Sequence, residues 1–487
     1  MEPIVRSGGV NRSEQILAHL CDRAFLPLWC YPNVYRAPNR ELCDVLVVFG
    51  DDVILFSDKS CAYPNSGRAD LDWTRWKRRA VDESVRQLQR AERWLRERPT
   101  EVYLDVKCTK RFPLPINAAG RFHKIVVAKG AGQDQRAKTI ERALKIHGPV
   151  VPCPSEPTPF ELFLSEYHPS FVHVLDDASL PILLSELDTA TDFLDYLNKK
   201  KEAFTSGLIH GSFGEEETLA IYLLSALEWN RATGKRGFPP PRPGHYYLIG
   251  PGHWDELRGR QAYGAKKKVD RVSYFWDEVL KRFGEDLHRG DATNPMNAPL
   301  VEHELIARRL ASETRVDRRR LSMALLQAQA KATNDAGSNR TLLSRTAKKF
   351  AYVFSFLPQL DMSFEEYRDY RRTYAAAYGQ HSLRRTAGLD RVLVVATEAD
   401  PSSGNSFDFV ALRRPPSDEH WDAELAEIAH ESGWASNLTD LDPKGIFDPE
   451  YPQPPKYKSG KAKHRAQDQK RKQERKAQRL ARRGHRH

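Results

Sequence analysis

The pattern of apolar and polar residues in the first 150 positions predicts a helix, three strands, a long helix and two more strands. The first helix, 14–25, has apolar residues at helical spacing, and Asn11 or Ser13 can cap it. The long helix, 72–98, gathers its apolar residues on one face and ends before Pro99. Strands are expected at 28–35, 41–49, 53–59, 101–108 and 122–128. This order predicts a mixed α/β domain over residues 1–150.

Beyond a proline-rich linker at 149–159, the pattern becomes mainly helical. Helices are predicted at 179–200, 215–232, 266–287, 301–309, 318–333, 340–356, 363–378 and 418–432. Strands are predicted at 246–249 and, as a neighbouring pair, at 390–397 and 407–412. We therefore expect a helical middle domain over 151–300, an α+β C-terminal domain over 301–435, and a Pro/Asp-rich linker with a disordered basic tail over 436–487.

Charge is distributed unevenly along the chain. Residues 456–487 contain 14 Lys/Arg and 2 Asp/Glu, so this tail carries +12 and the other 455 residues carry −1 of the total +11. A tail of this kind attaches to phosphates without sequence specificity. Its densest cluster, Lys470, Arg471 and Lys472, is a candidate nucleic-acid contact.

Composition also excludes several classes of protein. No apolar run reaches the roughly 18 residues of a membrane span, which argues against a membrane partner. The N-terminus lacks the apolar core of a secretory signal. The six cysteines form no Cys-x-x-Cys pair, so we expect reduced thiols rather than a disulfide framework or a zinc site. These features favour a cytoplasmic location.

The best clue to chemistry is the hairpin formed by 41–49 and 53–59, which turns at Gly50-Asp51-Asp52. Asp44 lies near the start of its first strand, and Lys59 ends the second. Because the two strands run antiparallel, these ends meet at one edge of the sheet. A carboxylate and an ammonium group held there can bind a divalent metal and orient its water.

This segment resembles the PD-(D/E)xK nuclease superfamily, whose core is a helix, three meandering strands, a crossing helix and further strands. The resemblance implies a restriction-endonuclease-like fold for residues 10–130. It implies that Asp44 binds a metal, that Lys59 orients the attacking water, and that Glu14 is the helix carboxylate. Ser57 stands where that family has Glu, Asp or Gln.

The missing carboxylate has two candidate sources, Glu41 and Asp58. Strand alternation points Asp58 away from Lys59 unless a bulge re-aims it. Mg²⁺ suits a site of this kind because it prefers oxygen ligands and retains several waters, and Mn²⁺ is the alternative. A second acid-x-Lys motif, Asp105-Val-Lys107, competes for the catalytic role if the helix 72–98 is inserted between the core strands.

These features predict a Mg²⁺-dependent nuclease that cleaves phosphodiester bonds of DNA or RNA, with a role in bacterial defence or genome maintenance by analogy. Arg75 and Arg79, on the arginine-rich face of the helix 72–98, are candidate phosphate contacts. The alternative is a catalytically degenerate protein that binds nucleic acid or another protein. The helical region offers a surface for a homodimer or a protein partner.

Overall fold

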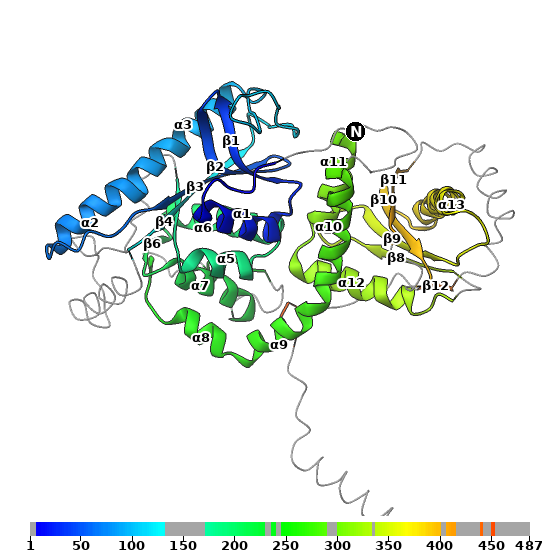
Figure 1. The fold of residues 1–487 in the computed structure, drawn as a ribbon. Coiled ribbons are helices and arrows are strands. Elements are labelled where there is room, and N and C mark those ends of the chain that lie inside the picture. Colours follow the sequence, from blue (N-terminus) through cyan, green and yellow to red (C-terminus); the bar gives the residue numbers. More distant parts are fainter. Residues whose placement is uncertain are drawn as a thin grey trace, which may run out of the picture.

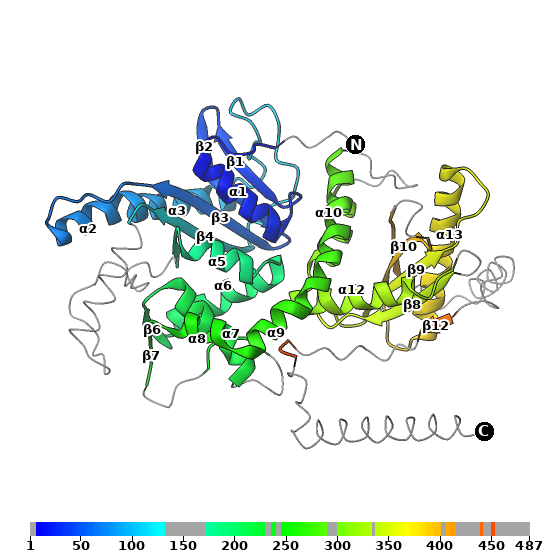
Figure 2. The same cartoon turned by 60° about the horizontal axis from the view of Figure 1, so that its bottom comes forward.

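The computed structural model describes residues 6–131, 171–228, 235–239, 245–289, 300–333, 337–400, 406–414, 439–441 and 450–452. It contains two five-stranded sheets with helices packed between and around them (Figures 1 and 2). The predicted linker 149–159, the predicted helix 418–432 and the basic tail with Lys470, Arg471 and Lys472 lie outside the described residues.

The first sheet has the order β1-β2-β3-β4-β5. Its strands are β1 (Cys30–Ala37), β2 (Arg40–Phe49), β3 (Asp52–Ser60), β4 (Arg121–Lys129) and β5 (His173–Asp176). The first three form an antiparallel meander, whereas β4 runs parallel to β3 and β5 runs parallel to β4. The hairpin β2–β3 is therefore confirmed, and its strands lie at the centre of the sheet.

Helices cover both faces of this sheet. On one face lies α1 (Arg12–Phe25), which begins at the predicted cap Asn11 and contacts β1, β2 and β3. On the other lies a continuous helical run made of α2 (Ala69–Lys77), the π-turn η1 (Arg78–Asp82) and α3 (Glu83–Glu97). The predicted helix 72–98 is confirmed, with an extra residue in its middle turn that periodicity does not reveal.

The predicted strand at 101–108 is wrong. Only isolated bridges join Tyr103 to Tyr35 and to Arg111. The Asp105 carboxylate instead accepts hydrogen bonds from nearby backbone amides, including those of Lys107 (3.0 Å) and Lys110 (2.6 Å). This side-chain capping closes a turn, which competes with the extended conformation of a strand.

Helices dominate the middle of the chain. They are α5 (Ser179–Glu186), α6 (Ala190–Thr205), α7 (Glu215–Glu228), α8 (His253–Gly259), α9 (Gln261–Asp270), the 3₁₀ turn η3 (Arg271–Ser273), α10 (Tyr274–Arg289), α11 (Leu300–Ala311) and α12 (Arg315–Gln329). Between them, β6 (Ile209–Ser212) pairs in parallel with β7 (Tyr247–Ile249). The predicted helix 179–200 is split because Thr189 caps a new helix by accepting from the Asp192 amide.

The second sheet has the order β11-β10-β9-β8-β12. Its elements are β8 (Ser338–Leu343), β9 (Phe350–Leu357), α13 (Phe364–Arg385), β10 (Arg391–Glu398), β11 (Asp408–Arg413) and β12 (Thr439–Leu441). The predicted pair at 390–397 and 407–412 is confirmed as antiparallel β10 and β11. The predicted helix 340–356 is wrong, because these residues form the antiparallel strands β8 and β9.

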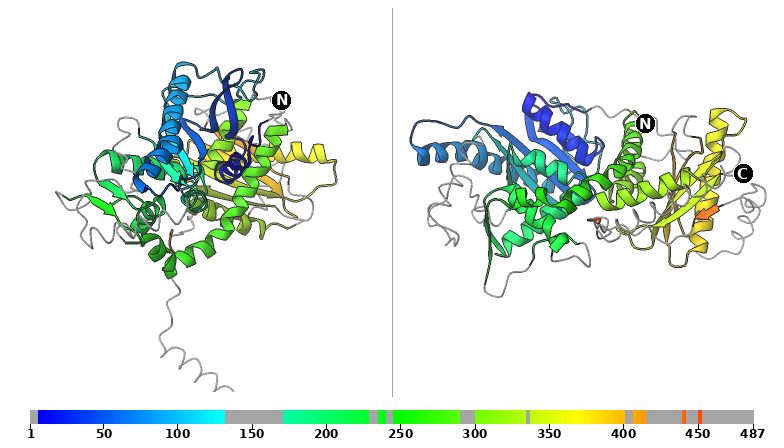
Figure 3. Two further views of the ribbon diagram at one scale, coloured as in Figure 1. Left: turned by 60° about the vertical axis from the view of Figure 1, so that its left-hand side comes forward. Right: turned by 90° about the horizontal axis from the view of Figure 1, so that it is seen from below.

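Packing encloses this second sheet between two helical layers. The helix α13 covers one face with Tyr374, Ala375 and Tyr378, whereas Trp276 of α10 packs edge-on against Tyr352 on the other. The helices α10, α11 and α12 thus lie between the two sheets, as the green elements of Figure 3 show. Within the described ranges, no helix combines the length and apolar composition needed to cross a bilayer.

Domain boundaries stay predictions. The strand β5 lies beyond residue 150 and yet belongs to the first sheet. The buried core of that sheet also continues into the helices between the sheets.

Candidate functional site

The central strands of the first sheet diverge and form a fork. Strands β2 and β3 pair from Val45–Phe56 to Phe49–Asp52, and beyond Val45 each strand continues with its other neighbour only. We call the polar residues at this divergence, Glu14, Asn33, Glu41, Asp44 and Lys59, the fork site. The structure therefore brings Asp44 and Lys59, predicted to share one edge, to the point where the strands separate.

Asp44 lies deepest in the fork, with 5 % of its surface exposed. Its Oδ2 atom accepts a 2.5 Å hydrogen bond from the backbone amide of Asp58 across the divergence. The pKa of Asp44 is raised to about 7, chiefly by burial and also by the charges of Glu41 and Glu14, against the opposing effects of that amide and of Lys59. Asp44 therefore feels the charges of three other ionisable residues of the fork site.

Two of these carboxylates are joined through Asn33. The Asn33 side-chain amide donates to Glu14 Oε2 and to Glu41 Oε1, each at 2.9 Å. Asn33 is buried in β1 and adopts a positive φ of 51°, a conformation that asparagine tolerates better than most residues. Burial and the charge of Glu14 raise the pKa of Glu41. Asn33 thus holds the carboxylates of Glu14 and Glu41 together, close to the carboxylate of Asp44.

Sequence reasoning missed Asn33. A single asparagine within a short extended run carries no catalytic signal, and its neighbour Pro32 indicates only a turn. The available signal was conformational, because asparagine favours the left-handed region that interrupts β1 here.

Lys59 and Asp58 point to different faces of β3. The Asp58 carboxylate accepts hydrogen bonds from Ser13 (2.6 Å) and Lys129 (3.0 Å), on the α1 side of the sheet. Ser57 lies on the opposite face, where its hydroxyl is 3.5 Å from Gln87 of α3. The structure therefore brings the backbone of Asp58, and not its carboxylate, to Asp44. The ammonium group of Lys59 forms no hydrogen bond or ion pair with the described residues, so it is available.

The donor chemistry of the fork site fits a hard cation. Glu14, Glu41 and Asp44 offer only oxygen atoms, and burial with mutual repulsion favours their neutralisation by a cation. In the part of the chain that the structure describes, no group of three or more His, Cys, Asp or Glu side chains is placed closely enough to hold a metal ion. The oxygen ligands of the fork site thus suit a hard cation in their chemistry, and the Asn33 amide occupies the position between the carboxylates of Glu14 and Glu41.

The competing motif lies near the fork site but is arranged differently. Asp105 is exposed and satisfied by backbone amides, and Lys107 follows in the same turn. Partial burial raises the pKa of Tyr35, and the charges of Glu41, Glu14 and Asp105 raise it further. Tyr35 is therefore within range of both the fork site and the Asp105 turn, which lie at the same end of the sheet.

The predicted phosphate contacts on the long helix are exposed. Arg75 lies in α2 and Arg79 in the π-turn, and both side chains face solvent. The α2 end of this helix projects past the strands of the sheet (Figures 1 and 2). The two arginines thus lie where a strand of nucleic acid can reach them.

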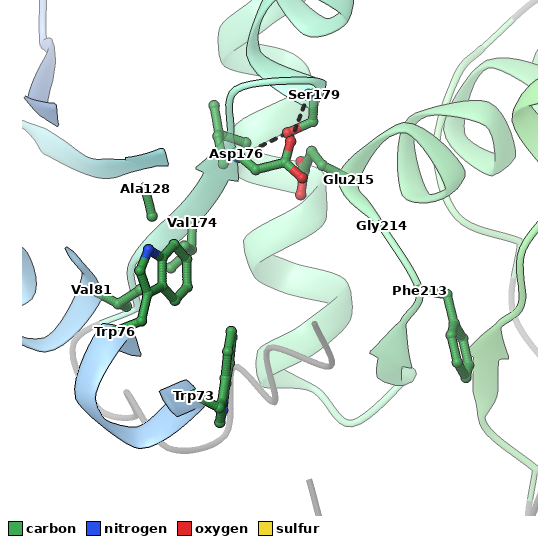
Figure 4. A pocket seen from close by; sticks show the side chains of 11 residues that line it. Trp73, Trp76, Val81, Ala128, Val174, Asp176, Ser179, Phe213, Gly214 and Glu215 are labelled. Atoms are coloured by element: carbon green, nitrogen blue, oxygen red, sulfur yellow. Dashed lines mark hydrogen bonds between the residues drawn. The ribbon is translucent and has the colours of Figure 1, made fainter. Parts of the chain in front are cut away.

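A small pocket lies at the C-terminal edge of β4 and β5, lined by Trp73, Trp76 and Glu215 among others (Figure 4). The two indole rings stack at 5.2 Å. Its volume is about 40 Å³, which is enough for water but too small for a nucleobase. The carboxylate of Glu215 is engaged by Tyr196 and Lys200. We therefore assign this pocket a packing role.

Comparison of the chain with protein-family models, with curated proteins and with solved structures found no significant match.

Proposed function

We propose that this chain is a metal-dependent nuclease of the PD-(D/E)xK type, with the fork site as its active site. The observation that carries the proposal is the divergence of β2 and β3, with Asp44, Lys59 and Glu41 within range of one another's charges. The element order supports it, since the resemblance implies a helix, three meandering strands, a crossing helix and further strands, and α1, β1–β3, the run α2–α3 and β4 follow that order.

Each residue of the fork site then has a role. Asp44 and Glu41 would hold a Mg²⁺ ion, with Glu14 as a further carboxylate. The bound ion would polarise the phosphate and lower the pKa of water. Lys59 would position the attacking water and offset the charge that develops on the phosphate. Asn33 would keep Glu14 and Glu41 together when the ion is absent.

Cleavage assays with the full chain test the proposal. Plasmid, linear duplex and RNA substrates are incubated with Mg²⁺, Mn²⁺ or EDTA. We expect metal-dependent cleavage that falls by about 100-fold or more in Asp44→Asn and in Lys59→Ala, since each removes a group acting on the reacting atoms. Circular dichroism checks that both variants fold.

The second acid-x-Lys motif supplies the matched controls. Asp105→Asn and Lys107→Ala change the same residue types in an exposed turn, and we expect cleavage within about twofold of wild type. Full activity in both Asp44→Asn and Lys59→Ala would refute the fork site. Loss confined to the Asp105 and Lys107 variants would move the active site to that motif.

A second function is favoured by Ser57. The position two residues before Lys59 carries a hydroxyl that faces Gln87, where the resemblance implies Glu, Asp or Gln. A catalytically degenerate scaffold that binds nucleic acid is consistent with this substitution. Binding of a labelled oligonucleotide in EDTA, without cleavage after Mg²⁺ or Mn²⁺ is added, would support this second function over the first.

A further inference from the structure

A basic groove lies beside the second sheet, on the side of α11. Its volume is about 620 Å³, and it runs between α11, the β8–β9 connection, the start of β10 and the end of β11. Its charged lining residues are Arg308, Arg309, Lys348, Lys349, Arg391, Arg413 and Asp390. Six cations thus face one carboxylate, while Leu305, Ile306 and Phe350 contribute an apolar floor.

Three of the cations are already engaged. Arg309 donates to Thr346 and Tyr352 and pairs with Glu313. Arg308 Nε lies 3.5 Å from Glu304 Oε1, and Lys349 Nζ lies 3.5 Å from Asp390 Oδ2. These contacts fix one wall of the groove.

The other three have no such partner among the described residues. The side chains of Lys348, Arg391 and Arg413 are exposed and form no hydrogen bond or ion pair there. Arg391 and Arg413 are moreover directly opposite each other in the antiparallel β10–β11 ladder. Like charges in this position destabilise a sheet, and an anion between them removes the penalty.

We propose that this groove binds the phosphodiester backbone of a nucleic-acid strand. Arginine and lysine side chains neutralise phosphates, and the apolar floor accommodates sugars or bases. The inference goes beyond the proposed nuclease, because binding here requires neither a metal ion nor cleavage.

Geometry separates the groove from the fork site. A Cβ atom built on Gly50, in the β2–β3 turn, would lie 2.5 Å from Arg308 Nη1, so the groove adjoins the turn of the hairpin. Asp44 lies six residues from that turn, or about 20 Å at roughly 3.3 Å per residue. The two sites therefore contact different segments of a bound strand.

Equilibrium binding in EDTA tests the proposal apart from catalysis. The full chain is titrated against fluorescein-labelled 20-nucleotide single-stranded DNA, single-stranded RNA and duplex DNA over a range of salt. The triple variant Lys348→Ala, Arg391→Ala, Arg413→Ala should bind at least about tenfold more weakly near 0.15 M salt. The slope of log affinity against log salt should fall by about 2 for single strands and nearer 3 for duplex.

A second triple variant controls for net charge. Arg258, Lys268 and Arg271 are exposed on α8, α9 and η3, and replacing all three with alanine should leave binding within about twofold. The groove variant should also melt no lower than wild type, because it removes the opposed arginines.

One result would overturn the proposal. Equal binding by the two triple variants would assign nucleic-acid binding to another surface.

Discussion

The surroundings of Asp44 disfavour the ionised form of its carboxyl group. It is buried beside Glu41 and within range of Glu14, and its pKa is raised from 3.8 to about 7. Around neutral pH the carboxyl is therefore shared between its neutral and ionised forms. A cation that binds there must displace this proton, so its affinity should rise with pH.

At this residue, we expect stability to fall as pH rises. The folded state binds an additional proton between the unfolded pKa near 3.8 and the folded pKa near 7, so Asp44 contributes an unfavourable term that grows over this window and is complete above it. At about 1.4 kcal/mol per pKa unit, the term reaches a few kcal/mol. Asp44→Asn, which retains an acceptor for the Asp58 amide, should therefore be more stable than wild type at pH 8 in EDTA.

Urea denaturation at pH 5 and pH 8 measures the effect. The advantage of Asp44→Asn should shrink at pH 5, where wild-type Asp44 is mostly neutral. A variant that is less stable than wild type at pH 8 would contradict the raised pKa. Added Mg²⁺ should stabilise wild type at pH 8 and leave Asp44→Asn unchanged.

At the scale of the element, α13 approaches the second sheet closely at Gly379. A Cβ atom at this position would lie 2.4 Å from Leu412 Cδ1 and 2.8 Å from Val394 Cγ2. The absence of a side chain, rather than backbone freedom, explains the glycine.

Gly379→Ala should destabilise the protein by about 1–3 kcal/mol, since overpacking outweighs the helix propensity that alanine gains. Shortening Leu412 to valine in the same chain should recover part of the loss. The control is Gly264→Ala in α9, where nothing lies within 4 Å, and we expect a gain of up to about 1 kcal/mol. Unfolding free energies from urea titrations test both. Equal effects at the two glycines would refute the packing explanation.

The elements that the sequence predicts best carry a clear local signal, either an apolar helix face or two β-rich runs around a turn. The helical run 69–97 and the hairpin strands show clear periodicity or strong β propensity, and they form as predicted. The strand β9 is buried on both faces, so its eight residues show no alternation, and Leu343, Ala347, Ala351 and Phe354 recur at helical spacing. This is why residues 340–356 resemble a helix in sequence.

For the candidate site, strand spacing brought forward Asp44 and Lys59, nearness in sequence added Glu41, and the resemblance added Glu14. The structure places Glu41, Lys59 and Glu14 within range of the charge of Asp44. Spacing could not show that Asp58 contributes its amide, because alternation concerns side chains only. Nor could it show the groove, whose opposed arginines, Arg391 and Arg413, come from strands whose register is fixed by tertiary pairing.

At the scale of the whole molecule, α12 joins the two sheets through buried charge. Arg315 donates to Asp188, between α5 and α6, at 2.8 Å and to Asp277 of α10 at 2.7 Å. Arg318 reaches Asp277 as well, and Arg319 pairs with Asp270. The same helix contacts β8 and β9 of the second sheet.

Arg315→Ala should cost about 3–5 kcal/mol, because it removes the guanidinium from the buried Asp188 and leaves Asp277 with Arg318 alone. Arg315→Lys should recover only part, since an ammonium group cannot reproduce the two-sided contact of the guanidinium. Arg271→Ala, at an exposed position, should change stability by less than about 0.5 kcal/mol. Chemical denaturation followed by tryptophan fluorescence gives these values. An Arg315→Ala protein as stable as the Arg271 variant would show that this network does not join the two sheets.

The divergence of β2 and β3 also has a consequence for protein synthesis. Residues 57–60 of β3 pair only with β4, so their path is set by residues 126–129, some seventy positions later in the chain. On the ribosome, a nascent chain that ends at the hairpin contains Asp44 and Lys59 but has nothing to draw their strands apart. The fork is therefore completed only after the long helix has crossed the sheet and β4 has been translated, and no shorter N-terminal fragment should display it.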